Sequence, residues 1–300
     1  MAMTTSNVKQ ISVSRFFEGL SSVPDKWRKV VDFRNTDTSS LRIAALTGIG
    51  DIGTWDGSAG ITSASIDSTG ASTMTYQGYA VQVKLNKYDI KDIPEITQLS
   101  AQKLGQAVAE KYRKLAFTHL AGFTSDAAGF ATADGKGLAD NTHTLAAGGT
   151  RDNHLTTALS RTAVMAAIKQ MRQFPNYQSQ YTSFADGALL LVVPPELEQT
   201  AIEIVHSGFN GGGDDGMQVN AVSLFNIEIV VDPYMTDAND WCLMTADTSS
   251  SPIKFWERSS PDFSLTELQL DTRQLLMTVD FAVATATGPQ PDGFIGGAVA

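Results

Sequence analysis

The sequence predicts an α+β fold, because strand-like and helix-like patterns occupy separate stretches of the chain. Apolar and polar residues alternate over 79–85 and again over 277–283, which is the period of a strand with one buried face. Residues 95–121 carry apolar side chains at helical spacing, directly after an Asp-Ile-Pro segment that is typical of a helix start. Hydrophobic residues make up 42% of the 300 residues and charged residues 18%, which excludes a disordered chain.

The N-terminal part predicts little regular structure. The first 35 residues or so are rich in Ser, Thr and Asn and show weak periodicity, so we expect an extended, loosely packed arm. Arg15–Leu20 has the composition of at most one helical turn, and Leu41–Leu46 suits a short strand.

The stretch Thr47–Gln77 contains no Lys or Arg and consists mostly of Gly, Ser, Thr, Ala and Asp. So few large apolar side chains do not readily offset the entropy lost on ordering the chain. Long loops of this kind are uncommon and are often functional. Two interpretations remain open, a floppy insertion and a projecting hairpin that a partner chain stabilises.

The helix predicted over 95–121 would be about 40 Å long at 1.5 Å per residue, long enough to cross most of the molecule. Loops and short hairpins follow over 123–153. A second helix is expected over 155–173, and a strand buried on both faces over 189–193.

The last third of the chain predicts short elements. We expect a helix over 196–206, a mobile glycine-rich tip over 210–216, strands over 227–231, 241–244 and 277–284, and a loose tail over 288–300.

The net charge of −10 argues against a dedicated nucleic-acid-binding protein, which usually shows a basic face. The charge is uneven, however. Residues 1–42 carry a net +3, which is either chance or a basic arm that faces an anionic partner. No apolar run approaches the roughly 20 residues of a membrane helix, and the polar start predicts no secretion signal.

No catalytic, metal or cofactor site is predicted. Gly48–Gly53 fits G-x-G-x-x-G, but no helix can follow it directly, so a dinucleotide loop is not supported. The four histidines have neither metal-site nor catalytic spacing, and the single cysteine, Cys242, lies in an apolar run typical of a buried core thiol.

Three segments, in this order, carry a resemblance to a known family: His154–Ser160 (HLTTALS), Leu190–Glu198 (LLVVPPELE) and Val230–Leu243 (VVDPYMTDANDWCL). They resemble the major capsid protein of tailed phages with the Hong Kong 97 type of fold, and are most similar to Mu-like major head subunits. The resemblance covers roughly residues 40–290.

The resemblance implies a division of the chain. Residues 1–46 would form an N-arm and first peripheral strand, and 47–80 an extended E-loop that reaches a neighbouring subunit. Residues 81–122 would form the peripheral domain with its spine helix, 123–246 an axial domain, and 247–300 the completion of the peripheral domain and a C-terminal tail.

The resemblance also implies a function. The chain would be a structural protein, not an enzyme, that assembles as hexamers and pentamers into an icosahedral shell around double-stranded phage DNA, in the host cytoplasm. Separate scaffold, portal and decoration proteins would be its partners, with no membrane. The expected inter-subunit residues are Trp55, Ile61, Ile66, Met74, Gly211, Gly212 and Gly213. The expected basic residues of the N-arm, which touch phosphates or scaffold, are Lys26, Arg28 and Lys29.

The residues that form a covalent crosslink in some members of this capsid family are missing. They join subunits by a Lys–Asn isopeptide bond, but here 44–83 contain no Lys and 240–300 no Asn, so no such crosslink is expected. Two alternatives remain: an encapsulin-like nanocompartment shell that encloses protein cargo, and a soluble enzyme or small-molecule-binding protein with a disordered loop.

Overall fold

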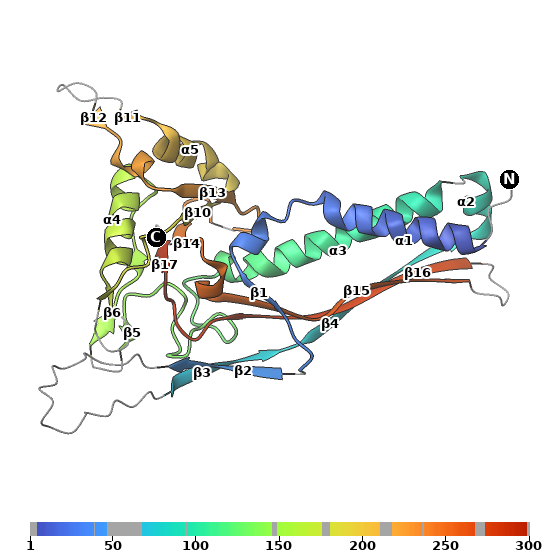
Figure 1. The fold of residues 1–300 in the computed structure, drawn as a ribbon, viewed down its shortest axis with the longest axis horizontal. Coiled ribbons are helices and arrows are strands. Elements are labelled where there is room, and N and C mark those ends of the chain that lie inside the picture. Colours follow the sequence, from blue (N-terminus) through green and yellow to red (C-terminus); the bar gives the residue numbers. More distant parts are fainter. Residues whose placement is uncertain are drawn as a thin grey trace, which may run out of the picture.

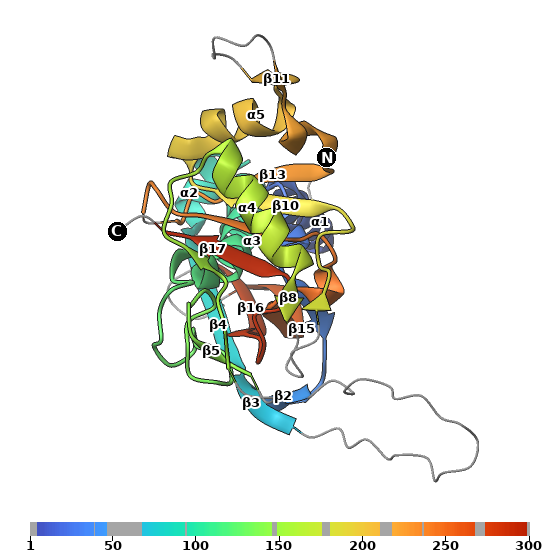
Figure 2. The same cartoon turned by 90° about the vertical axis from the view of Figure 1, so that its left-hand side faces the viewer.

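The computed structural model describes residues 5–38, 40–46, 68–93, 95–145, 149–175, 181–210, 218–235, 237–267 and 274–298. These residues form two parts (Figure 1). One is an elongated unit on a four-stranded sheet, and the other a shorter unit on a five-stranded sheet. Figure 2 shows the five-stranded unit from its outer end, where helices cover the sheet. The mixture of helices and strands confirms the predicted α+β class.

The four-stranded sheet has the order β1-β15-β16-β4, formed by β1 (Asp32–Asn35), β15 (Ile253–Glu267), β16 (Gln274–Thr287) and β4 (Gln77–Asn86). β1 is parallel to β15, and the other pairs are antiparallel. Three helical elements lie on one face of the sheet, α1 (Thr5–Ser22), η1 (Lys26–Lys29) and α3 (Ile96–Ala121), and α2 (Lys87–Asp92) leads from β4 to α3. The predicted strand over 79–85 and the late strand are thereby confirmed.

The long helix is present as predicted, over 26 residues. Its buried side packs on β16, where the ring of Tyr112 lies 5.0 Å from that of Phe281. The Tyr112 hydroxyl donates a hydrogen bond of 2.6 Å to the buried carboxylate of Glu257 on β15. Because a buried carboxylate is costly without partners, this bond fixes the rotation of the helix above the sheet.

The expectation of an extended N-terminal arm is wrong for residues 5–22, which form α1. Phe16 of α1 is completely buried and stacks on Phe263 of β15 at 5.0 Å. Gly19 of α1 and Gly105 of α3 let the two helix backbones touch, since a Cβ on either would lie 2.1 Å from a carbonyl oxygen of the other helix. Packing against α3 therefore supplies the helix stability that local sequence preferences lack.

A separate hairpin, β2 (Ser40–Leu46) and β3 (Ser68–Thr75), lies below the sheet and points away from it (Figures 1 and 2). The predicted strand 41–46 is thus confirmed. The root of the hairpin packs on the sheet face opposite the helices, where Met74 meets Trp256, Ala284 and Ala286. The residues that join the two strands, 47–67, lie outside the described residues, and so does the Gly48–Gly53 motif.

The five-stranded sheet has the order β13-β10-β14-β17-β7. Its strands are β13 (Ile227–Val231), β10 (Leu189–Val193), β14 (Trp241–Thr245), β17 (Phe294–Gly297) and β7 (His154–Leu155). In β10, Leu189, Leu191 and Val193 pack toward α4 (Arg161–Arg172) and α5 (Glu198–His206), whereas Leu190 and Val192 join the core that contains α3. The prediction of a strand buried on both faces is confirmed.

The remaining elements of this unit are short. They are β5 (His143–Thr144), β6 (Thr150–Arg151), β8 (Phe174–Pro175), β9 (Tyr181–Thr182), η2 (Pro195–Leu197), β11 (Phe209–Asn210), β12 (Gln218–Val219) and η3 (Ala221–Leu224). A further short helix, η4 (Thr248–Ser250), lies beside β1 of the four-stranded sheet. The loops and hairpin predicted over 123–153 are confirmed, and so is the helix near 196–206. Residues 211–217 of the expected mobile tip lie outside the described residues.

Two boundaries differ from the prediction. The second helix begins at Arg161 rather than Leu155, because the Ser160 hydroxyl accepts a hydrogen bond from the backbone N–H of Ala163 and caps the helix there. The tail is not loose: Phe294–Gly297 is a buried strand between β14 and β7. Gly297 makes this possible, since a Cβ there would lie 2.2 Å from the Trp241 ring. Residues 294–297 therefore belong to the five-stranded sheet and do not join the rest of 247–300 in completing the four-stranded unit.

Candidate interaction surfaces

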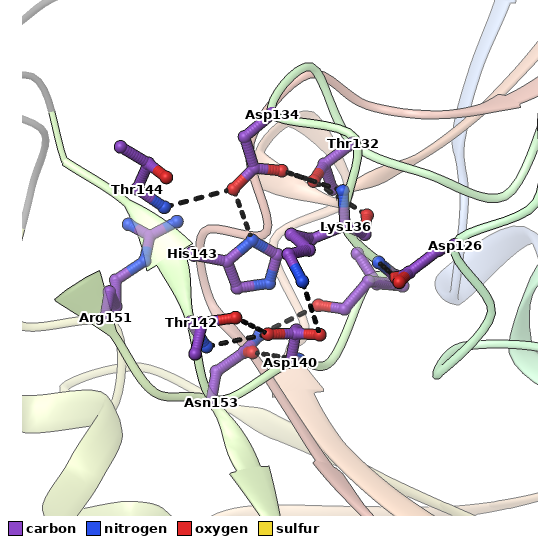
Figure 3. A network of polar contacts seen from close by, with 12 residues as sticks. Asp126, Thr132, Asp134, Lys136, Asp140, Thr142, His143, Thr144, Arg151 and Asn153 are labelled. Carbon is purple, nitrogen blue, oxygen red and sulfur yellow. Dashed lines mark hydrogen bonds and ion pairs between the residues drawn. The ribbon is translucent and has the colours of Figure 1, made fainter.

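A network of polar side chains, several of them titratable, joins the loops over 126–153 (Figure 3). The Asp134 carboxylate is its centre and accepts hydrogen bonds from His143 Nδ1 at 2.8 Å, from the Thr132 hydroxyl, and from the backbone N–H groups of Lys136 and Thr144, both at 3.2 Å. Burial by itself would raise the pKa of Asp134, but these hydrogen bonds outweigh it and hold the pKa well below its usual range.

This cluster is closed rather than open to a ligand. His143 is almost fully buried, and the neighbouring Asn153 donates hydrogen bonds to the carbonyls of Leu138 (2.8 Å) and Phe294 (3.1 Å). The Asn153 side chain also accepts the backbone N–H of Asp140 at 2.9 Å. The network therefore fastens the loops to β17, which is a structural role and leaves no carboxylate–histidine pair facing solvent.

Two further residues that could carry chemistry, His119 and Cys242, are buried in the core. Burial lowers the pKa of His119 to about 4, so its imidazole is neutral at pH 7 beside the Thr287 hydroxyl. Cys242 is fully buried on β14, as predicted, and burial raises its thiol pKa. Across the described ranges, no three His, Cys, Asp or Glu side chains lie together as a metal would require.

The same part of the chain contains no helix with the length and apolar character of a membrane span.

The inter-subunit residues predicted from sequence are only partly visible. Trp55, Ile61, Ile66, Gly211, Gly212 and Gly213 lie outside the described residues. Met74 is 1% exposed beneath the β2–β3 hairpin, against Trp256. Its side chain therefore anchors the hairpin within its own chain, and a contact of Met74 with another subunit stays a prediction.

The three basic residues of the N-terminal segment lie on η1, and all are exposed. Lys29 Nζ lies 2.7 Å from a carboxylate oxygen of Glu228 on β13 and so links the two units. The Arg28 guanidinium lies over the rings of Trp27 and Phe33, at 5.4 and 4.9 Å. Buried Trp27 fixes η1 on the helical side of the sheet, so the structure brings these three charges together on one short turn.

Large apolar side chains are exposed in the four-stranded unit on α1, on α2 and the residue that follows it, and on α3. They are Phe17 (49%), Tyr88 (73%), Ile93 (52%) and Leu99 (53%). The five-stranded unit adds Tyr181, Ile202 and Leu224, at 77%, 46% and 78%. Sequence reasoning missed this set, although the helical period places Leu99 opposite the buried stripe of α3 and so indicates it. Contiguous apolar patches are typical of surfaces that meet another protein, whereas single exposed apolar side chains are common on any protein.

Comparison with known proteins agrees with this geometry. Residues 66–296 match the family described as phage capsid protein. No curated protein sequence matches this chain as a relative.

Among solved structures, the fold is similar to a virus-like particle from Pyrococcus furiosus, with a TM-score of 0.55, 10% identity, and coverage of 97% of this chain and 98% of that one. It is also similar to the procapsid of bacteriophage JBD30, with a TM-score of 0.54, 15% identity, and coverage of 99% and 76%. The capsid of an empty GTA particle has a TM-score of 0.56 at 12% identity, with coverage of 91% and 89%. At these identities the likeness establishes the fold, which is the predicted Hong Kong 97 type.

Proposed function

Because this chain belongs to the phage capsid protein family and is a structural subunit of a virion capsid, we propose that its copies form the hexamers and pentamers of a closed icosahedral shell around double-stranded DNA. Scaffold, portal and decoration proteins are the further partners that we propose, and the host cytoplasm is the place of assembly. We propose no catalytic role, since the polar cluster around Asp134 is closed to ligands.

The β2–β3 hairpin is the observation that carries this proposal. Among the described residues the two strands pair only with each other, and only their root packs on the sheet. A two-stranded hairpin is marginally stable in water, and its outer edges present unpaired backbone N–H and C=O groups. Pairing with a neighbouring subunit would satisfy those groups by strand addition, which supports an interlocking shell.

We propose that Trp55, Ile61 and Ile66, which lie in the segment between the two strands, contact that neighbour. Gly211, Gly212 and Gly213 would lie near the centre of each capsomer. These glycines accept backbone conformations that other residues avoid, which suits copies in slightly different environments of one shell.

Negative-stain microscopy of the purified full-length chain tests the proposal, with closed shells of uniform diameter as the expected result. Native particles should absorb more strongly at 260 than at 280 nm, because they hold DNA. Protein cargo without nucleic acid would indicate a nanocompartment instead. A stable monomer or small oligomer at high concentration would refute the shell.

A variant then tests the hairpin. Replacing residues 47–67 by a short Gly-Ser linker should leave the free energy of unfolding of the subunit unchanged. The same replacement should prevent the subunits from assembling into shells. The matched control replaces residues 268–273, which connect β15 and β16, by a Gly-Ser linker as long as the one used in the 47–67 variant. If the 47–67 variant assembles as well as the control, the hairpin is not the assembly element.

A further inference from the structure

The positive charge of this acidic chain is concentrated on one layer. Residues 5–29 and 96–121, which contain α1, η1 and α3, carry nine basic and three acidic residues, a net charge of +6. The rest of the chain therefore carries −16. Residues 123–246 alone contain 14 acidic and five basic residues. These helices lie side by side on one face of the four-stranded sheet (Figure 1).

Four of the nine cations in this helical layer have a carboxylate partner: Arg15 with Glu18, Arg28 with Asp25, Lys29 with Glu228, and Arg113 with Glu110.

Lys103 and Lys114 differ from these four. Both are exposed on α3, and no carboxylate of the described residues lies within ion-pair distance of either. Lys103 donates a hydrogen bond to the neutral Gln106 side chain at 3.2 Å. Lys114 lies eleven positions after Lys103, so the two lysines project from the same side of the helix about 17 Å apart. Lys26 on η1 is likewise exposed, with no carboxylate partner among the described residues.

The opposite face of the same sheet has the other sign at its centre. Asp262 of β15 lies directly opposite Asp280 of β16, and both are exposed. Two carboxylates that face each other across adjacent strands repel one another and any third anion. The same face also carries Lys84, opposite Leu276, and Arg34, over the Trp256 ring, so its charges are mixed. The helical side, with its net charge of +6, is therefore the side of this sheet that attracts a polyanion.

We infer that the helical layer of α1, η1 and α3 faces the interior of the shell and contacts the phosphate backbone of the enclosed DNA through Lys26, Lys103 and Lys114. This inference rests on the proposed function, since only a closed shell has an interior. Each lysine that contacts a phosphate displaces a condensed counterion, so these contacts give binding without base specificity that weakens as salt rises. The acidic remainder would keep the other surfaces of the subunit free of DNA.

Binding of the unassembled full-length chain to a short DNA duplex, measured over a range of salt concentrations, tests the contact. In the K103Q/K114Q variant the slope of log Kd against log salt should fall by about 1.8, because each phosphate contact contributes about 0.9. The charge-preserving variant K103R/K114R should restore the slope. The matched control, K84Q/K169Q, removes two exposed lysines of β4 and α4, and its slope should equal that of the wild type.

Labelling of closed shells tests the orientation. An amine reagent too large to cross the wall should leave Lys103 and Lys114 unmodified until the shells are opened. If both lysines react in closed shells as fast as in dissociated subunits, the layer does not face inward and the inference fails.

Two further outcomes would separate the inference from its premise. If K103Q/K114Q binds DNA with an unchanged slope yet no longer forms shells, the layer serves an acidic protein such as a scaffold, and the DNA contact is refuted. If the wild-type chain forms no shells at all, the proposed function is refuted, whatever the salt dependence of DNA binding is.

Discussion

The contact between Gly19 of α1 and Gly105 of α3 allows a sharp test of how the N-terminal helix is held. In a Gly105→Ala variant the new Cβ would lie 2.1 Å from the Phe16 carbonyl oxygen and 2.8 Å from the Leu20 nitrogen. Ordinary van der Waals contact begins at 3.4 Å, so the helices must separate by more than 1 Å. Both clashing atoms are backbone atoms, so no side-chain rotation can relieve them.

The loss of unfolding free energy in Gly105→Ala depends on which apolar side chains are exposed when α1 moves away from α3. Phe16 is completely buried, and full burial of a side chain of this size is worth about 2–3 kcal/mol. The half-buried Val13 and Leu20 flank it and add about 1–2 kcal/mol. Alanine is the better helix former by about 1 kcal/mol, which offsets part of the loss. We expect the free energy of unfolding to fall by about 3 kcal/mol.

Urea unfolding of the unassembled chain, followed by far-UV circular dichroism, measures this change. Gly78→Ala on β4 is the matched control, because a Cβ there meets no atom within 4 Å. Its free energy of unfolding should stay within about 0.5 kcal/mol of the wild type. If Gly105→Ala is as stable as this control, the close approach of the two backbones does not hold α1 in place.

Three further predictions concern a buried acid, the hairpin root and covalent chemistry. Burial raises the pKa of Asp232 to about 7 from 3.8, so the folded chain favours its protonated form and stability falls as pH rises from about 4 to 7. Asp232→Asn should therefore gain up to about 4 kcal/mol at pH 8 and nothing at pH 4, and equal pH slopes for the two proteins would contradict this. Met74→Ala should cost about 2–3 kcal/mol of unfolding free energy and slow shell assembly, because it opens a cavity under the hairpin; normal assembly kinetics would argue against an anchoring role. Denaturing gels of mature shells should show a single 32.1 kDa band, whereas a ladder of covalent oligomers would disprove the absence of a crosslink.

Sequence patterns were sufficient to predict those helices and strands whose pattern lies within their own residues. The helix over 96–121 needs no partner to be recognised, because its apolar stripe and proline-marked start are local. The same holds for β10, a continuous apolar run that ends at two prolines, and for the alternation in β4 and β16. The order of three short segments was enough to indicate the capsid family, which the match over residues 66–296 confirms.

Long-range contacts decided the rest. α1 is a helix because Gly105, far along the chain, leaves room for its backbone, and β17 is a strand because Trp241 and Phe123 fill the space that Gly297 and Gly296 leave open. Neither fact has a local signature. The charge of the helical layer has the same origin. Lys26 on η1 and Lys103 and Lys114 on α3 share one side of the sheet only because both elements pack on that side, since sequence sets the number of charges but the packing of helices sets the face on which they lie.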